Sequence, residues 1–362
     1  MIERIKSNVI VTITDSISPT SMPYNEFVLY REKKRKDELQ ILILLFKNKI
    51  DKSIINIPKD VQLYCIGKNI LKLQSLLFKL EQKYNVRAYH IHEGKSVILF
   101  SVASFFLLRK KVIYTLHSTF KNYPFHNKLF SFCASILAKK VVCVSKTSYK
   151  YYPSILKRLR GKNVMAIQNG VDIERIEAAG KAYDIKDRPF TMVYVARLVP
   201  LKRHYILLEA LKHLPQVHLD LIGQGPLLEE LQQKAKDLGI EHQVCFKGLL
   251  PREEVYRLLK SADLYVSTSS YEGLPIGVLE AMGCGAPCLV TDIEQHTEIK
   301  DKSPSLLTLP ADVELWIKEI RKLVKMNKNQ IQQIGKKNHN YVSEYFSLAS
   351  MHQQYDKLYY KK

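Results

Sequence analysis

Short apolar segments alternate with longer amphipathic ones along the whole chain. The short segments are rich in β-branched or aromatic residues and are bounded by polar ones, which is typical of buried strands. In the first half the predicted strands are Asn8–Thr14, Gln40–Phe46, Val61–Cys65, Ala88–His92, Lys111–His117, Val141–Val144 and Val164–Gln168. The predicted helices between them include Leu71–Tyr84, Ser96–Leu108, Phe125–Ala138 and Lys146–Leu159. This alternation predicts a parallel sheet with helices on both faces.

The same alternation begins again after the polar segment Lys181–Pro189. Here the predicted strands are Thr191–Ala196, Val217–Ile222, Gln243–Phe246, Leu264–Ser267 and Cys288–Thr291. From Asp312 onward the pattern is helical only. We therefore predict an α/β fold of two doubly wound, Rossmann-like domains, residues 1–185 and 186–345. A C-terminal helix at 346–362 is expected to return to the first domain.

The positive charge of the chain lies almost wholly in its first half. The 362 residues hold 56 Lys and Arg against 35 Asp and Glu, a formal net charge of +21. Residues 1–180 account for 31 of the basic and 13 of the acidic residues, a net +18. Between Glu93 and Asp172 there are 14 Lys and Arg, many aromatic residues and no acidic one. This pattern favours contact with an anionic membrane surface, although single-stranded nucleic acid or a generally basic proteome would also account for it.

The charge pattern, together with the targeting and redox signals, leads us to expect a cytoplasmic protein that is peripheral on the inner face of the membrane. The longest apolar stretches, Leu39–Phe46 and Val97–Leu108, are shorter than the ~20 residues of a spanning helix. The N-terminus lacks the apolar core of a secretory signal. Six scattered cysteines in so long a chain are typical of reduced thiols rather than of a disulfide framework.

Loops that follow strands are where an open α/β sheet binds ligands. The loop after Thr191–Ala196 carries two cations, Arg197 and Lys202. The loop after Val217–Ile222 is a Gly-rich turn, Gly223–Pro226, in which Pro226 is expected at the first position of a helix. It lacks the third glycine of the dinucleotide fingerprint G-x-G-x-x-G.

The loop after Leu264–Ser267 gives the strongest local signal. Pro275 is expected to open a short helix, whose free backbone N–H groups form an anion site. Glu272 precedes this helix and Glu280 follows eight residues later, about 12 Å away if the rise is helical throughout. A diphosphate at the helix N-terminus would lie between the two carboxylates. This arrangement fits a nucleotide-sugar, with the ribose on one carboxylate and the hexose on the other.

Together these elements resemble the family-4 retaining glycosyltransferases, whose GT-B fold has two Rossmann-like domains facing across a cleft. The matching motifs are Glu272–Glu280 as an E-x7-E element, Ala196–Lys202, Gly223–Pro226, Val244–Gly248, Asn169–Asp172 and Thr115–Thr119. The chain departs from the family pattern where Ala196 and Arg203 replace glycines. It departs again where Asp15–Ser21 replaces a Gly-Gly loop, and at Ile293–Glu298 it keeps only the carboxylate.

The resemblance implies which residues act. Arg197 and Lys202 neutralise the departing diphosphate, Glu272 contacts the sugar, and His117 orients it, so these four are the expected catalytic residues. Glu280 is expected to bind the ribose. The expected donor-binding residues are Arg197, Lys202, Gly223, Gly225, Gly248, Leu249, Glu272, Gly273, Leu274, Pro275, Ile276 and Glu280.

The resemblance also implies the reaction, which is transfer of a hexose-type sugar from a UDP-sugar to a hydroxyl of a lipid-linked or polymer-linked glycan in envelope polysaccharide synthesis. No Asp-x-Asp triplet occurs, and we expect neither a metal nor a cofactor besides the nucleotide-sugar co-substrate. His90 and His92 alternate in a strand and could bind a metal, but a structural role is favoured because no third ligand is evident.

Other assignments stay open. Cys284 and Cys288 indicate a turn rather than a metal pair, and Glu93 and Lys146 are further cleft candidates. A sugar-nucleotide epimerase or a phosphorylase on the same fold is the alternative enzyme. A basic nucleic-acid-binding module is the alternative outside enzymes, although no RNA-binding signature is present.

Overall fold

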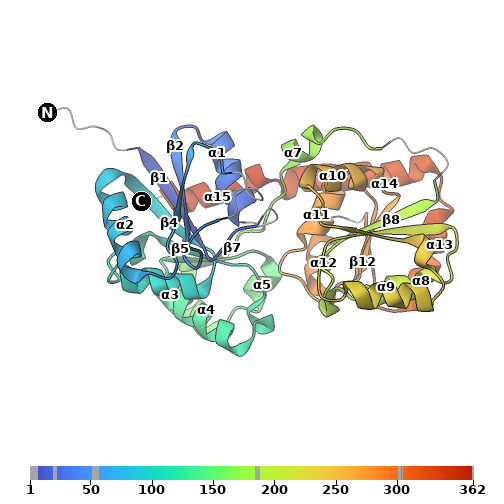
Figure 1. The fold of residues 1–362 in the computed structure, drawn as a ribbon, viewed down its shortest axis with the longest axis horizontal. Helices are drawn as coiled ribbons and strands as arrows, with labels where there is room; N and C mark the ends of the chain where they lie inside the picture. The colour runs from blue at the N-terminus through green and yellow to red at the C-terminus, as the bar shows by residue number, and fades with distance from the viewer. Residues whose placement is uncertain are drawn as a thin grey trace. The chain divides into compact units, whose positions relative to one another are not determined.

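The computed structural model describes residues 7–18, 23–50, 57–183, 188–300, 303 and 305–360. Residues 1–6, residues 19–21 of the predicted Asp15–Ser21 loop and residues 184–187 of the predicted linker lie outside the described residues. The chain divides into two compact units (Figure 1). The first unit is Met1–Asn169 with Met351–Lys362, and the second unit is Gly170–Ser350.

A parallel sheet forms the centre of the first unit. Within the described residues it has seven strands in the order β3-β2-β1-β4-β5-β6-β7. The strands are β1 Asn8–Thr14, β2 Glu38–Leu44, β3 Val61–Cys65, β4 Asn85–Ile91, β5 Val112–Leu116, β6 Lys140–Cys143 and β7 Val164–Ala166. The order reverses between β1 and β4, so their carboxyl ends form the switch point at which such sheets bind ligands.

Helices cover the two faces of this sheet unequally. One face packs against α2, α3 and α4, and the other is covered by η1, α1 and α15 (Figure 1). The helical segments of the first unit are η1 Pro23–Leu29, α1 Tyr30–Lys34, α2 Ile70–Lys83, α3 Gly94–Ala103, η2 Arg109–Lys111, η3 Phe120–Asn122, α4 Phe125–Leu137, α5 Lys146–Lys150, α6 Ser154–Arg160 and η4 Gly161–Asn163. The last helix, α15 Leu348–Tyr360, contributes its residues from Met351 onward to this unit.

A second parallel sheet forms the centre of the second unit. Within the described residues it has six strands in the order β10-β9-β8-β11-β12-β13. They are β8 Phe190–Val195, β9 Val217–Ile222, β10 Val244–Gly248, β11 Leu264–Ser267, β12 Cys288–Thr291 and β13 Leu306–Leu309. The order reverses between β8 and β11, which places their loops at the switch point of this sheet.

Two groups of helices enclose the second sheet. α7, α10, α11 and α14 pack together on one face, and α8, α9 and α13 lie on the other (Figure 1). The helical segments are α7 Ile173–Ala178, η5 Pro200–Lys202, α8 Tyr205–Leu211, α9 Leu228–Asp237, η6 Glu241–Gln243, α10 Arg252–Ser261, α11 Ile276–Gly283, α12 Glu294–Lys300, α13 Val313–Val324 and α14 Lys328–Tyr345. The predicted class, two doubly wound parallel-sheet domains, is confirmed.

Several predicted boundaries differ from the structure. The second unit begins at Gly170, whereas the predicted border followed residue 185; α7 packs against α10 and α11 and buries Ile176 in their core. The helix predicted to reach Leu108 ends at Ala103, and the one predicted at Lys146–Leu159 is two helices, with Pro153 before the second. Pro226 lies in the turn before α9 rather than in its first position, and β13 was not predicted.

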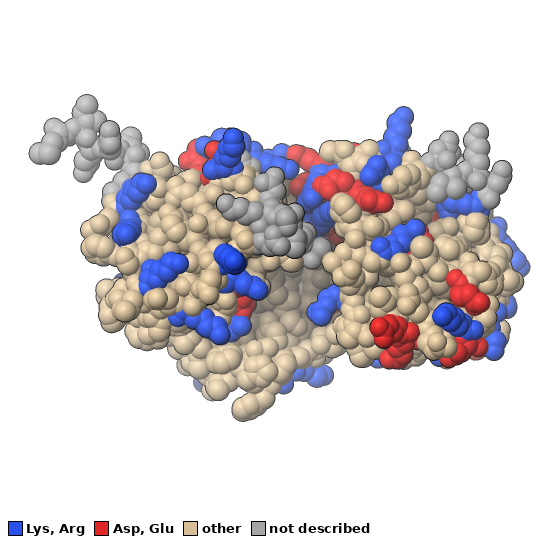
Figure 2. Space-filling model, in the orientation of Figure 1, with Lys and Arg blue, Asp and Glu red and all other residues tan. Residues whose placement is uncertain are grey.

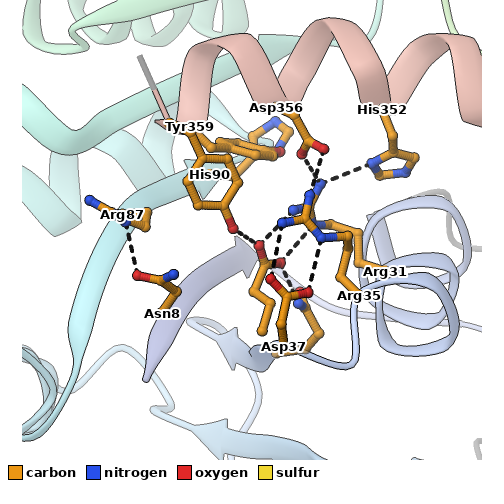
Figure 3. A network of polar contacts seen from close by, with 12 residues as sticks. Asn8, Arg31, Arg35, Asp37, Arg87, His90, His352, Asp356 and Tyr359 are labelled. Carbon is orange, nitrogen blue, oxygen red and sulfur yellow. Dashed lines mark hydrogen bonds and ion pairs between the residues drawn. The ribbon is translucent and has the colours of Figure 1, made fainter. Parts of the chain in front are cut away.

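A buried ionic network holds α15 against the first unit (Figure 3). Arg31, whose side chain is only 2% exposed, pairs with Glu38 and with Asp356 of α15, each at 2.7 Å. Asp356 also pairs with Arg35 at 2.8 Å. His352 of α15 donates from Nε2 to the carbonyl of residue 26 over 2.7 Å and accepts from Arg31 at Nδ1. Removing one partner of a buried ion pair leaves an uncompensated charge and is strongly destabilising. These contacts therefore hold α15 in place.

Candidate functional site

Two loops at the carboxyl ends of β8 and β11 are joined by hydrogen bonds in the second unit. The amide of Ser270 donates to the carbonyl of Leu201 over 2.8 Å. Thr268 Oγ1 donates to the carbonyl of Lys202 over 2.8 Å, and the buried hydroxyl of Tyr194 donates to the same carbonyl over 3.1 Å. Side chains from β8 and from the loop after β11 therefore hold the backbone of Lys202 in place, independently of the contacts that its own side chain makes.

The side chain of Lys202 forms an ion pair with Glu272. Nζ of Lys202 lies 2.5 Å from Oε1 of Glu272, and Ser269 Oγ donates to the same oxygen over 2.7 Å. The two charged side chains are 17% and 15% exposed, so solvent screens the pair less than it would at an open surface. Two predicted site residues that are 70 positions apart in the chain are thus in contact. A ligand that separates them must offer an anion to the lysine and hydroxyl donors to the glutamate.

Arg203 occupies the backbone conformation for which a glycine is usually needed. Its φ is +49°, in the left-handed region, and Thr268 Oγ1 also contacts its carbonyl, at 3.0 Å. A non-glycine residue in this region costs roughly 1 kcal/mol. Arg203 therefore keeps the backbone conformation that glycine would adopt here, with some local strain.

The Gly-rich turn after β9 packs directly on the loop that carries Arg197. A Cβ on Gly223, whose φ is +140°, would lie 2.0 Å from the carbonyl oxygen of Ala196, and a Cβ on Gly225 would lie 2.2 Å from that of Leu198. The amide of Gly223 in turn donates to the carbonyl of Gly248 over 2.8 Å. These contacts bring the three predicted donor loops together, and the side chain of Arg197 in the first of them is exposed.

The second glutamate of the pair has partners of its own. Glu280 lies in α11, which begins directly after Pro275, and its carboxylate is buried against α10. Oε1 accepts a hydrogen bond from Tyr256 over 2.9 Å and lies 3.1 Å from Nε of Arg252. The structure therefore gives Glu272 and Glu280 different cationic partners. Sequence reasoning did not find Arg252, because no local pattern links it to a residue 28 positions away.

A histidine pair marks the carboxyl edge of the first unit's sheet. His117 follows β5, and its Nε2 lies 2.8 Å from Nδ1 of His92, the residue after β4. Burial lowers the pKa of His117 to about 4, so its imidazole is neutral at pH 7. The predicted site residue His117 is thus held by a neighbour to which the sequence assigned only a structural role.

A carboxylate pair lies at the switch point between β1 and β4. Glu93 accepts hydrogen bonds from Thr14 Oγ1 over 2.8 Å and from the amide of Asp15 over 3.1 Å. Asp15 pairs with Lys95 at 2.6 Å and accepts from Ser96 Oγ over 2.5 Å. Burial, followed by the charge of Asp15, raises the pKa of Glu93 to about 8. Asp15 stands where the family pattern has its Gly-Gly loop, and nothing in the sequence indicated its contact with Glu93.

Two family models account for most of the chain. The model described as Glycosyltransferase Family 4 matches residues 32–175, and the model described as Glycosyl transferases group 1 matches residues 176–344. The chain belongs to the family-4 glycosyltransferases. The border between the two models lies within α7, close to the first residue of the second unit.

Curated relatives of this glycosyltransferase include enzymes with different donors. It is 24% identical over 303 residues to the UDP-Gal:alpha-D-GlcNAc-diphosphoundecaprenol alpha-1,3-galactosyltransferase of Escherichia coli, covering 77% of this chain and 75% of the relative. It is 36% identical over 136 residues to the GDP-mannose-dependent alpha-(1-6)-phosphatidylinositol monomannoside mannosyltransferase of Mycolicibacterium smegmatis. That match covers 33% of this chain and 35% of the relative.

Solved structures show the same fold. A glycosyltransferase from Rickettsia africae aligns with a TM-score of 0.80 at 17% identity, covering 98% of both chains. Anabaena HepE in complex with UDP-glucose aligns with a TM-score of 0.76 at 22% identity, covering 97% of this chain and 98% of the other. Identities this low establish a shared GT-B fold for the glycosyltransferase and no more.

Three further findings concern the described residues alone. None of their helices combines the length and hydropathy that crossing a bilayer requires. No cluster of three or more His, Cys, Asp or Glu side chains among them is placed to hold a metal ion. The six cysteines of the glycosyltransferase are free thiols.

Proposed function

We propose that this glycosyltransferase moves a hexose-type sugar, with retention, from a UDP-sugar to a hydroxyl of a lipid-linked or polymer-linked glycan of the cell envelope. The observation that carries the proposal is the sheltered Lys202–Glu272 pair between loops that hydrogen bonds fix in place. The galactosyltransferase of E. coli, whose name specifies a UDP-sugar and a diphosphoundecaprenol acceptor, supports the choice of donor and acceptor.

Charge stabilisation of the departing diphosphate is the main catalytic term of the proposal. Lys202 exchanges its glutamate partner for the diphosphate, and Arg197 and the N-terminus of α11 add positive charge. The released carboxylate of Glu272, with the backbone of Gly273 and Leu274, accepts hydrogen bonds from the sugar hydroxyls. Because negative charge grows on the diphosphate as its bond to the anomeric carbon breaks, these groups stabilise the transition state more than the ground state. We propose that they do this without a metal ion.

The remaining predicted residues take supporting roles in this proposal. Gly223, Gly225 and Gly248 bring the backbone close to the nucleotide, and Leu249 and Ile276 line the donor. Glu280 binds the ribose diol through its carboxylate. His117 of the first unit orients the transferred sugar.

Donor binding is tested by thermal melting against UDP-, GDP- and ADP-sugars in the presence of EDTA. A donor at a hundred times its Kd stabilises the folded state by about 2.7 kcal/mol, which for a chain of this size raises Tm by roughly 4 °C. Lys202→Ala is expected to abolish the shift, whereas Lys212→Ala, an exposed lysine of the same unit, is expected to keep it. A UDP-sugar shift that needs Mg²⁺, or one that survives in Lys202→Ala, contradicts the proposed site.

Transfer itself separates this proposal from its enzymatic rivals. With a labelled UDP-sugar and a lipid-linked glycan, we expect a labelled glycan and free UDP, with no product when the acceptor is omitted. An epimerase would change the donor sugar without any acceptor. Anomeric retention is read from the product by NMR, and an inverted product contradicts that part of the proposal.

We also propose that the first unit contacts an anionic membrane surface, and its exposed residues support this. Phe105, Leu107 and Phe125 are 68%, 80% and 84% exposed. Phe105 and Phe106 have φ values of +46° and +62°, a strained conformation that an ordinary turn would avoid. Lys and Arg predominate over Asp and Glu on the face of this unit seen in Figure 2, whereas the second unit shows both signs. Exposed aromatic residues among cations suit an anionic leaflet.

Liposome flotation of the full-length protein tests this contact. Binding is expected to vesicles that contain phosphatidylglycerol, to weaken with salt, and to fall at least fivefold in the double variant Phe105→Ser and Leu107→Ser. Leu315→Ser, which removes an exposed leucine of the second unit, serves as the matched control. Equal binding to neutral vesicles, or no loss in the double variant, contradicts the membrane assignment. Residues 1–180 alone are unsuitable for this test, because the first unit includes Met351–Lys362.

A further inference from the structure

Three imidazole rings stand in a row across β4 and β5 of the first unit. His90 lies within β4, His92 directly after it and His117 directly after β5. The ring centroids of His90 and His92 are 4.3 Å apart, and those of His92 and His117 are 5.1 Å apart. Only the second pair is joined by a hydrogen bond, the 2.8 Å contact between His92 Nδ1 and His117 Nε2.

This hydrogen bond decides which nitrogen of His117 remains for a ligand. Burial lowers the pKa of both residues, so each ring is neutral at pH 7 and shares a single proton with the other across the contact. Nε2 of His117 is thereby occupied. Nδ1 of His117 has no hydrogen-bond partner in the part of the chain that the structure describes.

Packing alone does not account for a histidine at position 92. The residue is 3% exposed, and its Nε2 is buried with no hydrogen-bond partner in the described part of the chain. A buried polar atom without a partner costs about 1–3 kcal/mol. An apolar side chain such as phenylalanine would avoid this cost beside the ring of Phe27, which lies 5.0 Å from that of His92. Nδ1 is the one polar atom of the His92 ring that has a partner, and that partner is His117.

His92 also packs against His90, whose ring is held by contacts with α15. Nδ1 of His90 lies 2.7 Å from the hydroxyl of Tyr359, and its Nε2 lies 2.7 Å from Thr115 Oγ1 (Figure 3 shows His90 beside Tyr359). Thr115 Oγ1 in turn lies 3.1 Å from the hydroxyl of Tyr355. Both nitrogens of His90 are therefore engaged, and its ring forms a fixed wall against which His92 packs.

We propose that His92 is a positioning residue of the transfer reaction: by holding Nε2 of His117, it turns Nδ1 of His117 toward the transferred sugar. The inference rests on the proposed function, because it assumes that His117 contacts the sugar. A loss of this contact leaves His117 free to rotate about its side-chain bonds. Misplacement of a contacting group by about 1 Å costs up to 100-fold in rate.

Amide substitutions separate positioning from packing. The amide nitrogen of Asn reaches the place of Nδ1, whereas that of Gln reaches further, toward the place of Nε2. In transfer assays we expect kcat to fall at least tenfold in His92→Phe and His92→Gln, and to stay within threefold of the native value in His92→Asn. KM for the donor is expected to change less than twofold in all three, because in the proposed function the other donor-binding residues all lie in the second unit and are unchanged. Thermal melting checks that each variant is folded, and exposed His242→Asn is the matched control.

The outcomes are distinguishable. Equal kcat in His92→Asn and His92→Gln, whether both normal or both low, overturns the inference, since a merely structural role does not depend on where the amide lies. If His92→Phe fails to fold, the Asn and Gln variants still decide the question. Absence of transfer by the native protein overturns the proposed function instead, and a native kcat in His117→Ala overturns its assignment of His117. Loss of activity in His117→Ala with no loss in His92→Gln overturns the positioning role alone.

Discussion

Replacing Glu93 by Gln removes a titratable group from the switch point between β1 and β4. Burial and the charge of Asp15 raise the pKa of Glu93 to about 8 in the folded protein, against 4.5 for an ordinary glutamate. Between these two values the folded protein keeps a proton that the unfolded chain has released. Stability is therefore greatest below the lower value and falls by about 1.4 kcal/mol per pH unit as pH rises through the window.

The size of the effect follows from the same two values. Between pH 5 and pH 8 the native protein is expected to lose about 3 kcal/mol of unfolding free energy relative to Glu93→Gln. The buried histidines with lowered pKa values change stability with pH in the opposite direction. Their contribution is the same in the native protein and in Glu93→Gln, so it drops out of the difference between the two unfolding free energies, which is the quantity to compare. Urea denaturation at each pH, followed by far-UV circular dichroism, measures it.

Two features of the chain supply controls. Its single tryptophan, Trp316, is buried in the second unit, so its fluorescence reports a transition that Glu93→Gln is expected to leave unchanged. Asp60→Asn removes an exposed carboxylate of the first unit and is expected to behave as the native protein does. Asp15→Asn is expected to reduce the pH dependence only in part, since burial is the larger cause. The reasoning is refuted if Glu93→Gln and the native protein lose stability in parallel between pH 5 and pH 8.

Three further substitutions test the backbone and the buried charges. Gly223→Ala places a Cβ 2.0 Å from the Ala196 carbonyl and is expected to weaken UDP-sugar binding at least tenfold by calorimetry; Gly161→Ala, also at positive φ but with open space around it, should not. Arg203→Gly relieves the left-handed strain and is expected to raise the unfolding free energy by about 1 kcal/mol, so a lower Tm contradicts it. Glu38→Gln removes one of the two negative charges that pair with the buried guanidinium of Arg31. It is expected to lower the unfolding free energy measured by urea denaturation by about 3 kcal/mol. An unchanged urea midpoint would contradict a stabilising role of the network.

The alternating pattern predicts most of the fold because strand and helix periodicities are local properties. It fails where a local signal is weak or a distant contact decides. β13 is an edge strand in which only Leu306 is fully buried, so it lacks the wholly buried run of the equally short β11 and β12. The early end of α3 depends on the left-handed conformations of Phe105 and Phe106, which no composition rule anticipates. The assignment of α7 to the second unit depends on its contacts with α10 and α11.

The candidate site shows the same division. Motifs locate Arg197, Lys202 and Glu272 because each stands at a strand end in a recognisable loop. That Lys202 and Glu272 are in contact is a property of adjacent strands, and the sheet order makes it predictable in principle. The partners Arg252, for Glu280, and His92, for His117, come from elements that the loops themselves do not specify.

The return of the chain's end to the first unit has a consequence for biosynthesis. The second unit is continuous in sequence and can fold as soon as it leaves the ribosome, whereas the first unit includes Met351–Lys362. At about 5–20 residues per second, synthesis of the intervening segment takes roughly ten to forty seconds. During that interval the N-terminal sheet lacks the helix that covers His90 and supplies Asp356 as a second partner of Arg31.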